Sequence, residues 1–209
     1  TVRRLDPNLC LYLPFEEGTG TMTKDLSGWG NHGTLVNGPT WTTGRAGKCL
    51  SFDGTNDYVD CGKDSSLNIG NEFTMEGWVK PNSSSNLMGY FGKRNDSSDD
   101  FYVLQLGSNN NLECRFRNSN GNYFDVSPKP VITPNVWNHI VFLKNGNEIK
   151  AYLNGSYVGR ADVYGLPANT NNYYIGKEGI HPFSGLIDEV RFYNRALSES
   201  EIQDHYLNP

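Results

Sequence analysis

The stretch "WNHIVFLKNGNEIKAYLNGSYVGRADV", residues 137–163, alternates apolar and polar side chains in three short runs. Two Asn-Gly dipeptides, Asn145-Gly146 and Asn154-Gly155, separate these runs. An Asn-Gly pair between alternating runs is the strongest short-range signal for a tight hairpin, because both residues tolerate positive φ angles. The stretch therefore predicts a meander of three antiparallel strands.

The same pattern recurs along the rest of the chain. Alternating runs occur in "NLCLYLPFEE" at 8–17, in "KCLSFDGTNDYVDC" around Asp53-Gly54, and in "EFTMEGWVK", which Pro81 closes. Further strands with Asn/Gly turns follow in "FYVLQLGSNNNLECRFRNSNGNYFDV" at 101–126. Many short antiparallel strands at this spacing predict an all-β antiparallel sandwich of the jelly-roll type, with about a dozen strands. At this length we expect a single domain over residues 1–209.

One helix is predicted, at the C-terminus, in "LSESEIQDHY". Ser198 can cap the helix, Glu201 completes a capping box, and Leu197 can pack against Ile202 as a hydrophobic staple. We expect the helix to run from Glu199 to Tyr206 and to pack on the sandwich.

The charge balance excludes some classes of partner. The chain has 18 Lys and Arg against 23 Asp and Glu, a net charge of -5, and no basic stripe. Nucleic acid is therefore not expected as a partner. No apolar run is long enough for membrane insertion, and the first residues lack the apolar run of a signal peptide. The richness in Asn, Ser, Gly and Tyr favours an extracellular domain, secreted or at the cell surface, that belongs to a longer protein.

Four cysteines, Cys10, Cys49, Cys61 and Cys114, lack the pairwise spacing of a zinc site. Their even number allows up to two disulfides in an oxidising compartment. Buried free thiols are an equally good interpretation in a chain of this length. The sequence leaves both alternatives open.

The loop "DLSGWGNHG" at 25–33 combines three glycines with oxygen-bearing side chains. Gly28, Gly30 and Gly33 allow sharp bends and close backbone approach. A calcium ion takes oxygens of the kind that Asp25, Asn31 and the loop carbonyls offer. Side chains that cap their own turn explain the same composition, and taken locally this second interpretation is the commoner one.

Three segments together resemble the laminin-G-like, concanavalin A-like jelly-roll superfamily. They are "LYLPFEEGTG" followed by "DLSGWGNHGTL", then "CLSFDGTNDYVD", and finally "FSGLIDEVRFYNRALSESEI". With "FTMEGWVKP" and "WNHIVFLKNGNEIKAYLNG" between them, the resemblance covers nearly the whole chain in order. It implies two antiparallel sheets packed face to face, with the strand near Leu11 to Phe15 beside the strand Leu186 to Tyr193.

The resemblance also implies a structural calcium ion that ties the N-terminal loop to a C-terminal strand. Its position falls on Asp25, Ser27, Gly30 and Asn31 of the loop and on Asp188 of "GLIDEV". Two distant carboxylates can come close together only if a cation or a proton offsets their repulsion. A calcium site explains both segments at once, so with the resemblance it is preferred to a bare turn.

The same superfamily includes glycoside hydrolases and polysaccharide lyases, so catalysis has to be considered. Glycoside hydrolysis needs two facing carboxylates. Glu76 stands alone in "TMEGW", and Asp188 and Glu189 are adjacent, which predicts opposite faces of a strand. Lyase-like segments are missing as well. We therefore expect no catalytic residues, with a hydrolase or lyase of this fold as a second alternative.

The four histidines receive separate interpretations. His32 and His139 occupy motif positions and are expected to be structural. His181, in "GIHPF", and His205, in the C-terminal helix, are expected to be exposed.

Two functional classes remain. A carbohydrate-binding, lectin-like module would stack sugar rings on aromatic side chains and bind their hydroxyls with Asn, Asp and Arg. The first alternative is a structural or adhesive module of a surface appendage or virion, which acts through protein partners. Loops of a rigid sandwich supply the candidate contacts with a polysaccharide or glycan. These candidates are Trp29, Tyr90, Arg94, Asp99, Tyr173 and His181.

Overall fold

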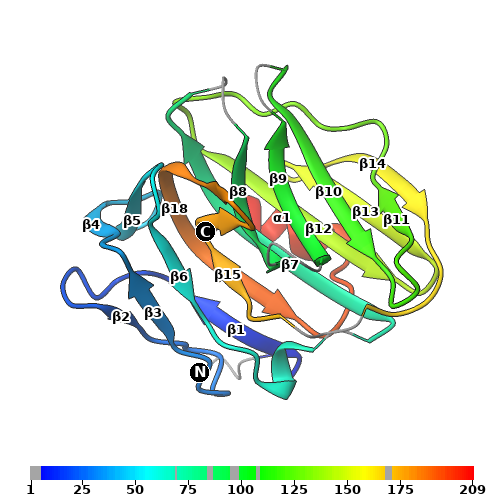
Figure 1. The fold of residues 1–209 in the computed structure, drawn as a ribbon, viewed down its shortest axis with the longest axis horizontal. Helices are drawn as coiled ribbons and strands as arrows, with labels where there is room; N and C mark the ends of the chain where they lie inside the picture. Colours follow the sequence, from blue (N-terminus) through cyan, green and yellow to red (C-terminus); the bar gives the residue numbers. More distant parts are fainter. Residues whose placement is uncertain (1–5, 69, 84–86, 95–98, 107–108, 168–170) are drawn as a thin grey trace.

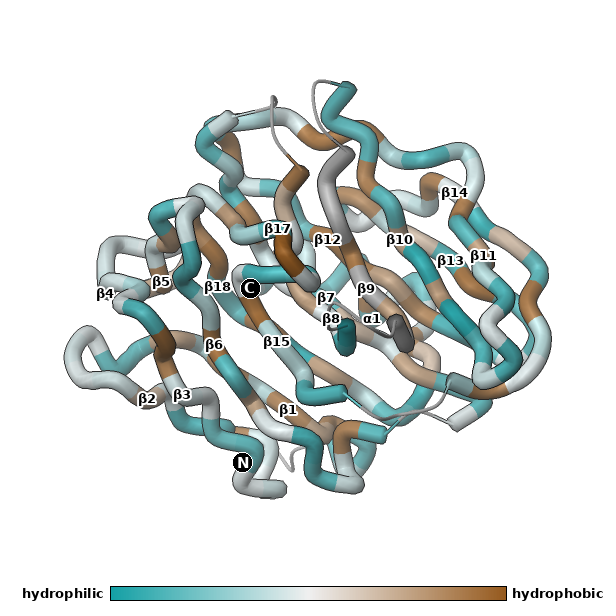
Figure 2. Tube along the Cα trace, viewed as in Figure 1, coloured by the Kyte–Doolittle hydropathy of each residue, from teal (hydrophilic) through white to brown (hydrophobic). Residues whose placement is uncertain are grey.

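Two antiparallel sheets pack face to face in the computed structural model (Figure 1). It describes residues 6–68, 70–83, 87–94, 99–106, 109–167 and 171–209. Hydrophilic and hydrophobic residues alternate along strands such as β10 (Asn111–Arg117), and Figure 2 shows both kinds of residue in each sheet. This alternation gives each sheet one apolar face, and the two apolar faces bury each other. The predicted all-β sandwich with one C-terminal helix is confirmed.

Sheet 1 has the order β14-β13-β12-β7-β18-β5-β4, and β1 pairs with β18 beside β5. Its strands are β1 (Leu9–Leu13), β4 (Thr40–Thr43), β5 (Lys48–Asp53), β7 (Glu72–Pro81), β12 (Asn138–Asn145), β13 (Glu148–Leu153), β14 (Ser156–Asp162) and β18 (Ser184–Tyr193).

Sheet 2 has the order β11-β10-β9-β8-β15-β6-β3-β2, and lies in front of sheet 1 in Figure 1. Its strands are β2 (Met22–Thr23), β3 (Gly33–Val36), β6 (Tyr58–Asp60), β8 (Met88–Arg94), β9 (Asp99–Leu106), β10 (Asn111–Arg117), β11 (Tyr123–Asp125) and β15 (Tyr174–Ile175). A separate hairpin joins β16 (Lys177–Glu178) to β17 (His181–Pro182), and a short 3-10 helix, η1, spans Ser65–Leu67. The two strands predicted around Asp53-Gly54 are present, but β5 and β6 belong to different sheets.

The predicted meander is β12-β13-β14. Leu153 pairs with Ser156, so Asn154 and Gly155 are the two central residues of the second turn, with φ of 52° and 75°. Two positive φ angles are the signature of the type I′ turn, whose twist matches that of paired strands.

The two ends of the chain meet in sheet 1, as predicted. Tyr12 of β1 lies opposite Arg191 of β18. The first strand ends at Leu13, earlier than expected, because Pro14 offers no N–H and Phe15 adopts a φ of 57°.

Helix α1 (Glu199–Leu207) packs on the outer face of sheet 1. Ser198 and Glu201 form the predicted capping box, and Leu197 and Ile202 both enter a small apolar cluster between the helix and the sheet. Burial of Ile202 contributes about 1.5 to 3 kcal/mol to holding the helix there. The buried members of the cluster are Leu9, Val141, Leu143, Tyr152, Tyr193, Leu197 and Ile202.

The main core lies between the sheets. It contains two residues that were predicted to contact a ligand, so both predictions are wrong. Tyr90 and Tyr173 are both 0% exposed and pack among core side chains. A bulge in β8 between Gly89 and Phe91 turns Tyr90 inward together with Phe91. Neither tyrosine can touch a ligand on the surface.

The four cysteines are free and buried, so the free-thiol alternative is the one observed. Helix α1 has nine residues, and no described helix is long and apolar enough to span a membrane.

Candidate functional site

The outer face of sheet 2 over β3, β6 and β15 concentrates aromatic and hydrogen-bonding side chains. Val59 and Ile175 are 0% exposed in the core. Because side chains alternate along a strand, their neighbours Tyr58, Asp60 and Tyr174 face outward. These three are partly exposed.

Tyr58 and Tyr174 meet edge to face, with ring centroids 5.7 Å apart and an interplanar angle of 83°. The Lys177 ammonium lies 3.7 Å from the Tyr58 centroid and 4.3 Å from that of Tyr174. Cation–π contacts of this kind hold both rings in place. Burial, with smaller effects from Asp60 and Tyr58, raises the pKa of Tyr174, so its hydroxyl stays protonated at neutral pH. We call Tyr58, Asp60, Asn172, Tyr174 and Lys177 the tyrosine platform.

A cavity of about 360 Å³ lies beside the tyrosine platform, with Asp60 and Asn172 among its lining residues. The Asn172 amide donates to both Asp60 oxygens, at 2.9 and 3.1 Å, and the Gly62 N–H donates to Asp60 Oδ1 at 2.8 Å. The carboxylate is thereby oriented and still has lone pairs for a ligand hydroxyl.

His32 and Thr34 line the same cavity from β3 and the loop before it. The Asp25 N–H donates to His32 Nδ1 at 3.0 Å, so in the neutral imidazole Nε2 carries the proton and is the donor. The cavity therefore presents an N–H donor, a hydroxyl and a carboxylate together. That combination suits a ligand rich in hydroxyl groups.

Tyr58 lines a smaller cavity of about 210 Å³. Asn37, Asn56 and Lys177 contribute polar groups, and Ile180, which is 73% exposed, contributes an apolar wall. Strand β6 therefore contributes to both cavities, with Tyr58 lining the smaller one and Asp60 the larger one.

The remaining predicted ligand contacts are scattered. Trp29 is 54% exposed on the loop at 25–33. Arg94 of β8 forms an ion pair with the buried Glu178, and His181 lies partly buried in β17 opposite Glu178. Asp99 begins β9, but its side chain lies outside the described part of the structure. These residues stay predictions, and none of them belongs to the tyrosine platform.

In the loop at 25–33, Asp25 is the centre of a capped turn. Its carboxylate accepts hydrogen bonds from the N–H groups of Tyr12, Ser27 and Asn31, each at 2.9 Å, and from the Ser27 hydroxyl at 2.7 Å. Gly30 has a φ of 80°, as the bend requires. Asp25, Ser27 and Asn31 are thus together as predicted, with Ser27 and Asn31 donating to the Asp25 carboxylate.

Asp188 lies in a different hydrogen-bond network. Its Oδ2 atom accepts from the Arg45 and Ala46 N–H groups at 2.8 and 3.1 Å, and its Oδ1 atom from the Glu189 N–H at 2.9 Å. Burial, opposed by the Ala46 and Arg45 hydrogen bonds and reinforced by Glu189, raises the pKa of Asp188 to about 7. No group of three or more His, Cys, Asp or Glu in the described ranges is placed to hold a metal. An ion at this place would have to replace hydrogen bonds that the Asp25 and Asp188 carboxylates already accept, and calcium binding stays a prediction.

The expectation that Asp188 and Glu189 point to opposite faces is wrong. Glu189 has a φ of 53°, and the pairing register shifts between Asp188 and Arg191. Asp188 lies opposite Trp78, which stacks on α1, while the Tyr12 hydroxyl donates to Glu189 at 2.9 Å on the same side of sheet 1. A bulge adds one residue to the strand and so overrides the alternation.

Glu76 does not stand alone either. It is 0% exposed on the outer face of sheet 1, beneath α1. His205 Nδ1 lies 2.8 Å from one of its oxygens, His139 Nε2 lies 3.5 Å from the other, and Arg191 Nη1 lies 3.7 Å away. Burial would raise the pKa of Glu76, but the contacts and charges of His139 and His205 outweigh it and hold that pKa well below its usual range. We call these four residues the buried charge cluster.

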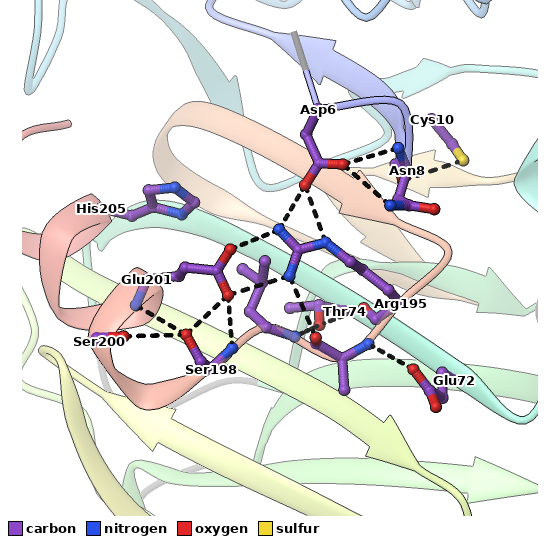
Figure 3. A network of polar contacts seen from close by, with 12 residues as sticks. Asp6, Asn8, Cys10, Glu72, Thr74, Arg195, Ser198, Ser200, Glu201 and His205 are labelled. Atoms are coloured by element: carbon purple, nitrogen blue, oxygen red, sulfur yellow. Dashed lines mark hydrogen bonds and ion pairs between the residues drawn. The ribbon is translucent and has the colours of Figure 1, made fainter.

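Helix α1 is fastened over this cluster at its N-terminal end too. Figure 3 shows the Arg195 guanidinium between Asp6 and Glu201, with Arg195 Nε 2.9 Å from Asp6 and Nη1 3.0 Å from Glu201.

His205 was expected to be exposed, but its side chain is 23% exposed because it points at Glu76. A cavity of about 380 Å³ between β1, β18 and α1 is lined largely by these paired ionic groups.

A match to a family model decides the wider classification. Residues 53–203 match the model of the Laminin_G_3 family, described as the concanavalin A-like lectin/glucanases superfamily. The chain belongs to this superfamily. The matched range contains β6 and β15 and all five residues of the tyrosine platform.

Solved structures share this superfamily fold along nearly the whole chain. The binding domain of Paraclostridial Mosquitocidal Protein 1 is 22% identical, with a TM-score of 0.79 over 97% of this chain and 52% of its own. Domain 4 of AbnA, an extracellular arabinanase from Geobacillus stearothermophilus solved with arabinotriose, is 21% identical, with a TM-score of 0.77 over 94% and 97%. The binding domain of botulinum neurotoxin DC, in complex with SialylT, is 12% identical, with a TM-score of 0.74 over 96% and 51%. The chain thus spans about half the length of the two toxin chains.

Proposed function

We propose that this chain is a non-catalytic, lectin-like module that binds a polysaccharide on the outer face of β3, β6 and β15. The observation that carries the proposal is the tyrosine platform: two rings fixed edge to face beside a 360 Å³ cavity with an oriented carboxylate and amide. Sugars combine apolar ring faces with hydroxyls that both donate and accept. Aromatic rings beside fixed polar groups are complementary to both features.

The comparisons support a binding role at the level of the shared fold. Two of the similar structures are binding domains of toxins, and the third is an arabinanase domain solved with an oligosaccharide. The arabinanase and its domain 4 also favour an extracellular module of a larger protein, as the composition does. Ligand identity does not transfer at these identities, so the proposal depends on the tyrosine platform itself.

The distribution of carboxylates supports a role without catalysis. Asp60 is the acid that lines the 360 Å³ cavity, and it is already bonded to Asn172 and Gly62. Glycoside hydrolysis requires a second carboxyl group across the sugar. Glu76 lies on sheet 1, where it is buried beneath α1 and contacts His205. The sequence did not predict these contacts.

Affinity electrophoresis against a panel of neutral and acidic polysaccharides tests the proposal. We expect retardation by at least one polymer, with a Kd in the micromolar to millimolar range, because a shallow face buries few sugar rings. Tyr174→Ala should weaken binding by about tenfold, since it removes one stacked ring. The matched control is Tyr157→Ala, a 49% exposed tyrosine on β14 of sheet 1.

Two results would contradict the proposal. Absence of retardation by every polymer, together with capture of a protein partner, would favour the structural or adhesive alternative. New reducing ends or unsaturated products from any polymer would favour a hydrolase or lyase.

A further inference from the structure

The tyrosine platform belongs to a longer row of residues that crosses sheet 2. Residues paired in register lie on the same face of a sheet, so the pairings define one line of outward positions. In order from β3 to β11 the row is Thr34, Asp60, Tyr174, Gly92, Tyr102, Arg115 and Asp125. Seven strands about 4.8 Å apart give the row a length of about 29 Å. At β8 the row is partly covered, because Glu178 of β16 packs against Gly89 and pairs with Arg94, on either side of Gly92. A ligand that starts on the tyrosine platform and reaches the arginines of β10 therefore passes over this ion pair.

Strand β10 turns its charged residues toward this face. Leu112, Cys114 and Phe116 are 0% exposed in the core, so Glu113, Arg115 and Arg117 point the other way. They form the far end of the face from the tyrosine platform.

Most charges at this end are paired. Arg115 donates to Asp125, with Nη2 2.8 Å from its Oδ2 atom, and lies 3.1 Å from Glu113. Lys129 lies 2.8 Å from Glu113. These two cations and two carboxylates balance each other, and the group has no net charge.

Arg117 is different. Its guanidinium carbon lies over the Tyr123 ring, 5.1 Å from the centroid, and no carboxylate of the described residues lies within ion-pair distance of it. Tyr123 is 50% exposed and also contacts Arg115, at 5.0 Å. The Arg117 Nε atom is buried without a hydrogen-bond partner among the described residues. A guanidinium over an aromatic ring can offer its remaining N–H groups in the fork geometry that matches a carboxylate.

We propose that Arg117 binds the carboxylate of an acidic sugar, so that the polysaccharide recognised by this face is a polyuronate or another carboxylated glycan. This inference rests on the proposed function, because it takes the tyrosine platform as the other end of the same site. Arg117 gives this face a positive charge without an acidic partner, in a chain whose net charge is -5. Such a charge selects acidic over neutral chains.

The test compares each acidic polymer with its own uncharged form. The probes are polygalacturonate, alginate and hyaluronate, each alongside its carboxyl-reduced product. We expect at least one acidic polymer to bind about tenfold more tightly than its reduced form, and this preference to weaken at high salt. Arg117→Gln should remove the preference while leaving the weaker binding of the reduced polymer unchanged. Arg160→Gln is the matched control, because Arg160 is an exposed, Glu148-paired arginine on β14 of sheet 1.

The outcomes separate the two proposals. The acidic-sugar site is overturned if the acidic polymer and its reduced form bind with equal affinity. It is also overturned if Arg117→Gln leaves the preference for the acidic polymer unchanged. In both cases the platform proposal stands. Preference for a neutral polymer of the wider panel, lost in Tyr174→Ala, likewise overturns the acidic-sugar site alone. Failure of every polymer, acidic and neutral, contradicts the proposed function and this inference together.

Discussion

The outer faces of the two sheets carry similar aromatic and ionic side chains but have different roles. On sheet 1, α1 covers the central strands, and aromatic and ionic side chains are buried beneath it: Trp78 stacks on Tyr206 at 5.6 Å, and Glu76 is 0% exposed. On sheet 2, Tyr58, Asp60 and Tyr174 stay partly exposed beside a cavity. The difference shows that residue type does not mark a binding face. What matters is whether another element of the fold already covers the face.

The charged side chains of the two outer faces also differ in their contacts. In the buried charge cluster the partners of Glu76 come from three elements, β12, β18 and α1, so their attraction holds the fold together. On sheet 2, Asp60 is oriented by a neutral amide, and Arg117 rests on a ring. These groups keep part of their hydrogen-bonding capacity for a ligand.

The largest effect expected from this difference is that of Glu76→Ala. Removal of this carboxylate takes away the anion that His139 and His205 contact and leaves Arg191 with Glu189 as its carboxylate partner. Loss of one partner from a buried ionic group destabilises by about 3 to 5 kcal/mol. Unfolding by denaturant should show this decrease, and polysaccharide binding by the folded fraction should be unchanged.

Glu76→Gln is the control for this prediction, because it keeps the volume and removes the charge. It should be destabilised less than Glu76→Ala. The contrary result is a variant that unfolds with native stability but binds the polysaccharide with a changed affinity. It would show that the face around Glu76 binds the ligand, and would contradict the structural role given to it.

A pH effect of intermediate size is expected from Asp188. Its folded pKa of about 7 lies above the ordinary value of 3.8, so the protonated form favours the folded state. That contribution is fully present below the unfolded pKa and is lost as pH rises through about 7. Between about pH 5 and pH 8 the loss should be on the order of 2 kcal/mol.

Asp188→Asn should flatten this part of the pH profile, because an amide does not titrate. The measurement is the free energy of unfolding of the native chain and of the variant between about pH 5 and pH 8. The difference between the two values at each pH removes the contribution of the histidines, which both proteins share. Parallel profiles for the native chain and the variant would contradict the role given to Asp188.

The smallest expected effect is that of calcium at the predicted site. The Asp25 and Asp188 carboxylates already accept hydrogen bonds that an ion would have to replace. We expect added calcium to stabilise the fold by about 1 kcal/mol at a few-fold excess over Kd, and Asp25→Asn to abolish this gain. Identical thermal unfolding curves with calcium and with chelator would show that the loop at 25–33 is only a capped turn.

Most of the fold could be predicted because its signals are local. The turn at Asn154-Gly155 and the capping box at Ser198 and Glu201 depend on neighbouring residues alone, and both are present. The bulge at Glu189 has no comparable local signal. It was missed, and with it the joint orientation of Asp188 and Glu189.

The site was harder to predict because it depends on which face each strand residue occupies. Tyr173 in "NNYYIG" was the predicted contact, but it is buried and the adjacent Tyr174 faces outward. A shift of one residue exchanges the two faces of a strand. The alternation in "DYVD", where Tyr58 and Asp60 flank the apolar Val59, is the signal that could have identified half of the tyrosine platform.

Ligand-induced changes in backbone amide NMR shifts test the central claim most directly. The protein is titrated with an oligosaccharide of the polymer that binds most tightly in affinity electrophoresis. We predict changes concentrated in β3, β6 and β15 and at Asn172, with little change in α1, β7 and β12. Changes concentrated beneath α1, around Glu76 and His205, would contradict the account, because they would place the ligand on the face that the fold has closed.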